Sequence, residues 1–184
     1  TPIKSSAASD VYKRQGLADF ERGLALLDEL NSPDCVIGYT NLADTLMDLG
    51  ELSRAAEMRA RSQRAAERFG DARSVLWLRV ELCGERYWAG DWDEAMRIAD
   101  SFIAESEGGQ RHYQEIFARV VRGRIRLARG GALTALDDAA RALEFARSAR
   151  DPQALYPALA LTARAQAVAG RPSDAAEAAG ELLD

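Results

Sequence analysis

Cysteine and histidine are scarce in this sequence, and their spacing excludes the usual metal and redox sites. The two cysteines, Cys35 and Cys83, lie far apart and lack the paired spacing of zinc sites and redox motifs. The one histidine, His112, falls at the start of an expected helix, where an exposed or capping side chain is the ordinary interpretation. We therefore expect no metal, no cofactor and two small packing thiols in a reducing, cytoplasmic compartment.

Excess positive charge and long apolar runs are also missing. The 24 basic and 29 acidic residues give a formal net charge of −5, which argues against a general nucleic-acid or anionic-membrane surface. No apolar run approaches the roughly 18 to 20 residues that span a bilayer, and the N-terminus lacks the apolar segment of a signal peptide. We expect neither nucleic acid nor membrane as a partner.

Sequence motifs of known enzyme classes are absent as well. The chain has no P-loop, no dinucleotide fingerprint and no metalloprotease helix motif. The adjacent acids Asp137 and Asp138 point in different directions on a helix, and Asp91, Asp93 and Glu94 suit the first turn of one. We therefore predict a protein without catalytic residues.

Lysine is confined to the first residues of the chain. Lys4 and Lys13 are the only lysines, and every later basic residue is arginine. Residues 1–15 resemble a translated sequencing-adapter artefact of the kind found in metagenome-derived reading frames. We expect a non-native, disordered tail over 1–15 and a native domain over 16–184 that has been cut from a longer protein.

A period of 40 residues runs through the remaining chain. Glycines recur at this spacing, each followed five residues later by alanine and preceded seven residues earlier by a small residue. In a helical hairpin the glycine ends the first helix, and the small residues let two antiparallel helices approach closely. The three sets are Gly50, Gly90, Gly130 and Gly170; Ala55, Ala95, Ala135 and Ala175; and Ala43, Cys83, Gly123 and Ala163.

Apolar side chains repeat with the same period on each first helix. Their spacing of four, three and four residues is one face of a helix, and β-branched alternating runs typical of strands are lacking. Helices are predicted at 16–30, 34–49, 52–69, 72–89, 92–106, 111–129, 132–149, 152–169 and 172–183, with Pro157 expected to kink or delay its helix. The stripes are Val36, Thr40, Ala43 and Met47; Leu76, Val80, Cys83 and Tyr87; Ile116, Val120, Gly123 and Leu127; and Tyr156, Ala160, Ala163 and Ala167.

This pattern resembles a tetratricopeptide repeat over residues 16–184. The resemblance is carried by Asn41-Leu42-Ala43 before Gly50, and by Ala89-Gly90-Asp91-Trp92 leading to Ala95. It implies an all-α solenoid of about nine helices, in antiparallel pairs that form a right-handed superhelix. The family repeats at about 34 residues, and periods of about 40 to 47 leave a HEAT or armadillo-like fold as an alternative.

Arginines and aromatic residues on the first helices are the candidate binding residues. Stacked repeats would align the arginines into a basic ridge for an acidic peptide, unless Glu81, Glu85, Glu115 and acids of the second helices neutralise it. Trp77 and Phe117 lie one period apart at the place of Ile37, either in the core or in a groove. The resemblance implies that first helices line the concave surface. The candidate partner-binding residues are Asp44, Asp48, Trp77, Arg79, Arg86, Trp88, Arg119, Arg122, Arg124 and Arg126.

Two functions compete. The first is a non-catalytic protein-interaction scaffold whose groove binds a peptide or a neighbouring domain. Such alanine-rich, arginine-only repeats resemble those of large bacterial signalling proteins, such as nucleotide cyclases and ATP-dependent transcriptional activators. The second is a structural or oligomerisation spacer whose groove is filled by its own chain. A small-molecule enzyme would need a closed polar pocket with shifted acid or base groups.

Overall fold

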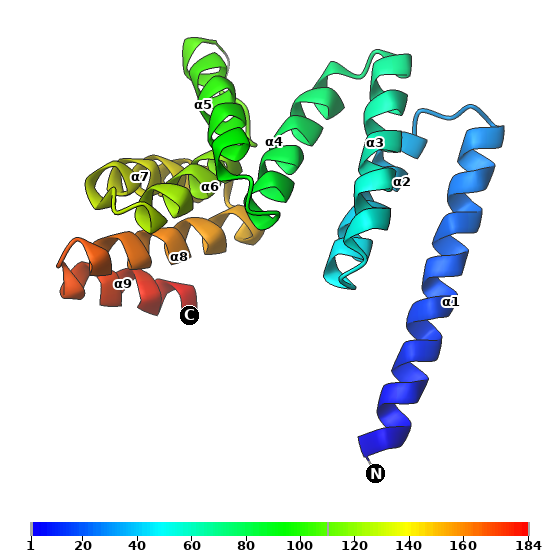
Figure 1. Cartoon of the computed structure of the whole chain (residues 1–184), viewed down its shortest axis with the longest axis horizontal. Coiled ribbons are helices and arrows are strands. Elements are labelled where there is room, and N and C mark those ends of the chain that lie inside the picture. The colour runs from blue at the N-terminus through cyan, green and yellow to red at the C-terminus, as the bar shows by residue number, and fades with distance from the viewer. Residues whose placement is uncertain (1, 110, 184) are drawn as a thin grey trace. The chain divides into compact units, whose positions relative to one another are not determined.

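The computed structural model describes residues 2–109 and 111–183, with side chains from residue 15 onward in these ranges. Within them the chain forms nine helices and no strand (Figure 1). The helices are α1 (Pro2–Glu29), α2 (Cys35–Asp48), α3 (Leu52–Phe69), α4 (Ala72–Trp88), α5 (Trp92–Gly108), α6 (Glu115–Ala128), α7 (Ala132–Ala149), α8 (Pro152–Val168) and α9 (Pro172–Leu183).

The all-α, helical-repeat prediction is confirmed, and most helix ends fall within two residues of their predicted positions. α6 is the exception among the later helices, since it begins at Glu115 and not at residue 111. A turn precedes it, in which the Glu115 N–H donates to the carbonyl of His112 at 2.9 Å.

The expectation for Pro157 was wrong in one respect, because α8 begins at Pro152 and runs through Pro157 without a delayed start. Asp151 caps this helix by accepting the Gln153 N–H at 2.9 Å.

The backbone of residues 2–15 is helical and belongs to α1, where the sequence predicted a disordered tail. The segment has no glycine before Gly16, and its proline falls at the first helical position, where proline is tolerated. The side chains of residues 1–14 lie outside the described residues. The non-native origin of this segment stays a prediction.

The four turn glycines adopt the left-handed backbone conformation that the sequence predicts. Gly50, Gly90, Gly130 and Gly170 have φ values of 77°, 83°, 83° and 75°. At each turn the N–H of the next residue donates to the carbonyl four residues before the glycine, as Asp91 does to Arg86 at 2.9 Å. This bond is typical of the Schellman motif, which ends a helix and satisfies its last carbonyls. The 40-residue period is therefore a period of helix-ending turns.

The chain divides into two compact units, with the boundary between Leu78 and Arg79 inside α4. In the first unit α2 packs against α1 and along α3. Its core is mostly aliphatic and includes the predicted small residues Ala43 and Ala55, which are both buried. The buried residues of the main cluster are Leu24, Cys35, Val36, Tyr39, Leu42, Leu46, Ala55, Ala65, Ala66 and Leu78.

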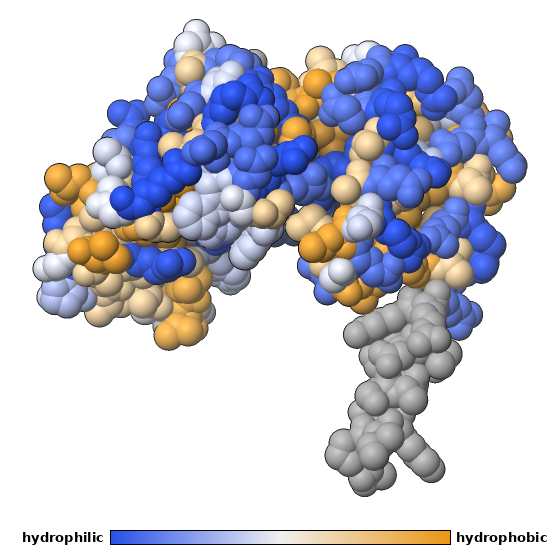
Figure 2. All heavy atoms as spheres, in the orientation of Figure 1, coloured by the Kyte–Doolittle hydropathy of each residue, from blue (hydrophilic) through white to orange (hydrophobic). Residues whose placement is uncertain are grey.

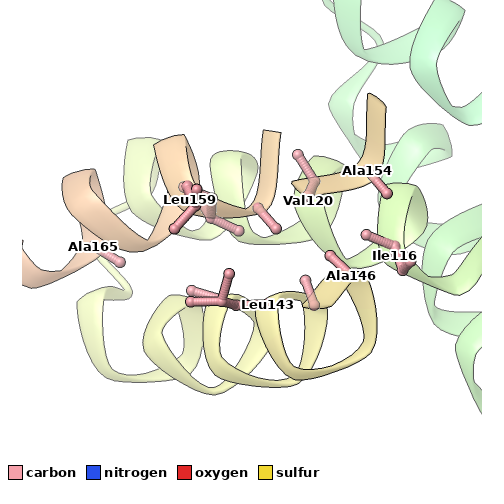
Figure 3. Packing of buried hydrophobic residues seen from close by; sticks show 11 residues of the cluster. Ile116, Val120, Leu143, Ala146, Ala154, Leu159 and Ala165 are labelled. Atoms are coloured by element: carbon pink, nitrogen blue, oxygen red, sulfur yellow. The ribbon is translucent and has the colours of Figure 1, made fainter. Parts of the chain in front are cut away.

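In the second unit the hairpins α6–α7 and α8–α9 stack side by side, since α6 packs against both α7 and α8. Figure 3 shows Ile116 and Val120 of α6, Leu143 and Ala146 of α7, and Leu159 of α8 pointing into one shared core. Close approach is needed at Gly123, because a Cβ built there would lie 2.6 Å from Leu161 Cδ2. The small residues predicted at the helix crossings are thus buried in the first three hairpins.

The fourth apolar stripe differs from its prediction. Tyr156 is 51% exposed, and α8 buries Ala154, Ala158 and Leu159 in its place. Of the other stripe residues, Ala160 and Ala163 are half-buried and Ala167 is exposed. The predicted apolar stripe is therefore buried or half-buried in the first three hairpins, whereas the prediction is wrong for the fourth.

Candidate functional site

A hollow of about 430 Å³ lies between α2 and the first part of α4, within the first unit. Ile37 and Trp77, which are one 40-residue period apart, both line it. Two of its lining residues, Thr40 and Leu78, are buried and form its base. The remaining residues stand at the start of α4. The complete lining is Ile37, Thr40, Asp71, Arg73, Ser74, Trp77 and Leu78.

The α4 side of the hollow is fixed by a helix cap. Asp71 precedes α4, and its carboxylate accepts the backbone N–H of Ser74 at 3.1 Å and the Ser74 hydroxyl at 2.5 Å. These hydrogen bonds hold the pKa of Asp71 below its ordinary value, so the carboxylate stays charged at neutral pH. The cap sets where α4 begins and thereby places Trp77 in the second turn of the helix.

The α2 side combines an exposed apolar side chain with a satisfied polar base. Ile37 is 59% exposed, which is unusual for isoleucine. Behind it the Thr40 hydroxyl bonds the Val36 carbonyl at 3.1 Å and the Ser62 hydroxyl of α3 at 2.9 Å. The Thr40 hydroxyl at the base is therefore already hydrogen-bonded, and the walls offer the apolar side chains of Ile37 and Trp77 and the charged side chain of Arg73 to a ligand.

Two predicted site residues, Asp44 and Asp48, are exposed farther along α2. They lie seven and eleven residues after Ile37, which places them on the same helix face. Arg59 of α3 approaches Asp44, with Nη2 3.4 Å from Oδ1. Partial burial raises the pKa of Asp44, Arg59 opposes that rise, and the like charge of Asp48 adds to it. The helix itself contains no basic residue.

Three of the four predicted arginines of α6, Arg119, Arg122 and Arg126, enter a buried ionic cluster and do not form a basic ridge. Asp138 of α7 is fully buried and accepts Arg122 Nη2 at 2.6 Å and Arg126 Nη1 at 2.8 Å. Arg119, 1% exposed, pairs with Asp138 at 3.5 Å and donates to Glu115 at 2.7 Å. The alternative of neutralisation by Glu115 and by acids of the second helices is thus confirmed for these arginines. Their guanidinium groups hold α6 to α5 and α7.

The other predicted site residues of the second unit are scattered. Arg79 donates to both carboxylate oxygens of Glu105 at 2.7 and 2.8 Å. Arg86 stands 3.9 Å from Asp91 at the α4–α5 turn, and Arg124 is half-buried on α6. Trp88, the last residue of α4, is 68% exposed with its ring edge-on to Tyr87.

Exposed apolar side chains are otherwise dispersed. On the face drawn in Figure 2, orange residues stand in small groups among hydrophilic ones.

Of the residues that line the hollow, the sequence predicted Trp77 as a site residue but not its neighbours Asp71, Arg73 and Ser74. The capping pattern of an aspartate three residues before a serine was the available signal, because it places the start of α4 beside Ile37.

The two cysteines and the histidine contribute to packing and helix capping. Cys35 and Cys83 are free thiols with 0% exposure, as predicted for packing residues, and burial raises the pKa of Cys83 to about 12. His112 is half-buried and its Nδ1 accepts the Gln114 N–H at 3.2 Å, which is a capping contact. Over the described ranges, no helix has the length and apolar character to cross a bilayer.

Comparison with known proteins supports the fold alone. No protein-family model matches the sequence, and no curated protein matches it. Among solved structures, the chain is similar to the crystal structure of BtubC (BKLC) from P. vanneervenii, with a TM-score of 0.70 and 15% sequence identity. The match covers 96% of this chain and 74% of that one. At this identity the likeness shows a shared helical fold.

Proposed function

We propose that the chain is a tetratricopeptide-like repeat region that acts as a non-catalytic scaffold and binds a peptide of a partner protein between its first helices. The observation that carries the proposal is the hollow of about 430 Å³ with Ile37 and Trp77 on its walls. These residues occupy equivalent positions in consecutive first helices. The hollow is therefore lined by equivalent positions of neighbouring repeats, which is what we expect of a peptide-binding groove in a repeat protein.

The chemistry of the hollow suits a side chain more than a substrate. Tryptophan is enriched among residues whose truncation weakens protein interfaces most, because it buries a large apolar area when a partner covers it. The base of the hollow has satisfied hydrogen bonds, and the Asp71 carboxylate is engaged by Ser74. Shape and apolar contact with Ile37 and Trp77 are therefore the main means of recognition that the hollow offers.

A spacer whose groove is filled by its own chain is the competing proposal. The hollow favours the binding module, because a groove occupied by neighbouring side chains would not leave a space of this size beside a 59% exposed isoleucine. A role within a larger bacterial signalling protein, with catalysis in other domains, fits this scaffold as a further part of the proposal.

The test is peptide capture with two matched polar substitutions. Peptides selected from a random library on the purified chain are titrated by calorimetry against Ile37→Asn and Leu133→Asn. Leu133 is 75% exposed at the start of α7 and serves as the control. We expect Ile37→Asn to weaken binding by about 1 kcal/mol or more and Leu133→Asn to leave it unchanged. Equal effects, or no selected peptide, would overturn the proposal.

Trp77→Ala is a second variant for the same titration. We expect it to lose about 2 kcal/mol of binding free energy, as interface tryptophans commonly do. Because Trp77 is half-buried, circular dichroism and the melting temperature must first show that the variant remains folded. Full binding by a folded Trp77→Ala protein would place the peptide elsewhere.

A further inference from the structure

The charge along α2 decides what kind of peptide fits the hollow. α2 contributes Asp44 and Asp48 to its exposed face and has no lysine or arginine. Asp48 is one helical turn beyond Asp44, so the two carboxylates repel each other along the same face. This arrangement favours a ligand that brings positive charge to that end of α2.

The charges beside these acids leave a negative surface. Arg59 contacts Asp44 from α3, but its side chain is 6% exposed and it lies 3.4 Å from one carboxylate oxygen. Asp44 keeps 54% of its side chain exposed. Around the hollow itself, Arg73 is the basic lining residue and Asp71 the acidic one, so they balance. The excess negative charge therefore stands along α2 and not around the hollow.

We propose that the hollow receives an aliphatic or aromatic side chain of a basic peptide whose lysine or arginine, about three to five residues away, reaches Asp44 and Asp48. This inference rests on the proposed function and adds the chemistry of the partner. Seven helical residues separate Ile37 from Asp44, a rise of about 10 Å, and eleven separate it from Asp48, about 16 Å. An extended peptide covers these distances in about three and five residues.

A random library of peptides about ten residues long tests the inference, since an extended chain of that length spans about 33 Å. Selection on the wild-type chain is followed by sequencing and by titration of single peptides at low and high salt. We expect lysine or arginine to be enriched about three to five positions from an aliphatic or aromatic residue. Affinity should fall as salt screens the exposed charges.

The matched variants neutralise two acids each. Asp44→Asn with Asp48→Asn should weaken the selected peptides by about tenfold, because each exposed ion pair contributes at most about fivefold. Asp137→Asn with Asp174→Asn removes two exposed acids from the second unit and should leave affinity unchanged.

Two failures are distinguishable. Peptides that lose binding to Ile37→Asn but carry acidic or uncharged residues would overturn this inference and keep the proposed function. The same conclusion follows if the Asp44 and Asp48 variant binds basic peptides as tightly as the wild type. A library that gives no binder contradicts the proposed function and this inference together.

Discussion

Gly123 of α6 lies so close to Leu161 of α8 that a Cβ built on the glycine would stand 2.6 Å from Leu161 Cδ2. Asp138 Cβ of α7 would lie 3.4 Å away on another side. Three helices therefore meet where the sequence places a small residue seven positions before the turn glycine. The contact is a direct link between the repeat pattern and the stacking of the α6–α7 and α8–α9 hairpins.

Gly123→Ala should destabilise the chain by up to about 2 kcal/mol. Alanine gains about 1 kcal/mol of helix propensity over glycine, but the buried Leu161 must move, and overpacking costs about 1 to 3 kcal/mol. Gly84→Ala is the control, because a Cβ on Gly84 meets nothing within 4 Å. It should stabilise α4 by about 0.5 to 1 kcal/mol in urea unfolding. Stabilisation by both variants would contradict the close packing.

Asp138→Ala should be among the most destabilising single substitutions in the second unit. It leaves the buried Arg119 and Arg122 without this carboxylate, and breaking a buried ion pair costs about 3 to 5 kcal/mol. Asp137→Ala removes an exposed carboxylate 3.2 Å from Arg141 and should change stability by less than about 1 kcal/mol. Chemical unfolding of the two neighbours measures the difference. Similar losses for both would show that the cluster is not a coupled unit.

Helix-ending turns offer a pair of opposite substitutions. Gly130 has φ 83° with open space around it, so Gly130→Ala should cost about 1 to 2 kcal/mol through backbone strain alone. Arg150 ends α7 with φ 55°, where a side chain is strained, and Arg150→Gly should gain up to about 1 kcal/mol. Melting temperatures should move in opposite directions. A loss on replacing Arg150 would mean that its side chain contributes more than its backbone costs.

The ion pair of Arg79 with Glu105 predicts a pH dependence. Hydrogen bonds from Arg79, and then from Ser101, lower the pKa of Glu105 to about 2. A lowered pKa in the folded state means that this stabilisation is present above the ordinary value of about 4.3 and is lost as the pH falls toward 2. Carboxyl NMR should find the Glu105 midpoint near 2 in the wild type and closer to its ordinary value in Arg79→Gln, where the hydrogen bond from Ser101 remains. An unchanged midpoint in the variant would contradict the ion pair as its cause.

How far the sequence predicts this fold depends on how local each feature is. Gly50, Gly90, Gly130 and Gly170 were predictable because a helix-ending turn is encoded within a few residues, and all four have positive φ. The partners of Arg119 and Arg122 were only partly predictable. Asp138 is far from both along the chain, and the helix crossing that joins them is set by packing.

Part of the candidate site was predictable from the repeat, and part of it was not. Trp77 and Ile37 share a repeat position, which marked them as neighbours in consecutive first helices. The burial of Arg119 was not visible, because arginine is ordinarily exposed and the acids that accompany it come from α5, α6 and α7. The exposure of Tyr156 was missed because the apolar sequence pattern recurs in α8, whereas the burial of the equivalent positions does not.

Methyl NMR of the chain with a selected peptide tests the central proposal most directly, because it locates the ligand without a substitution. We predict that the Ile37 methyl resonances and those of Leu78 and Thr40 shift on titration, while those of Leu133 and Val168 stay fixed. Shifts confined to residues outside the hollow, with Ile37 unaffected by a bound peptide, would contradict the proposal.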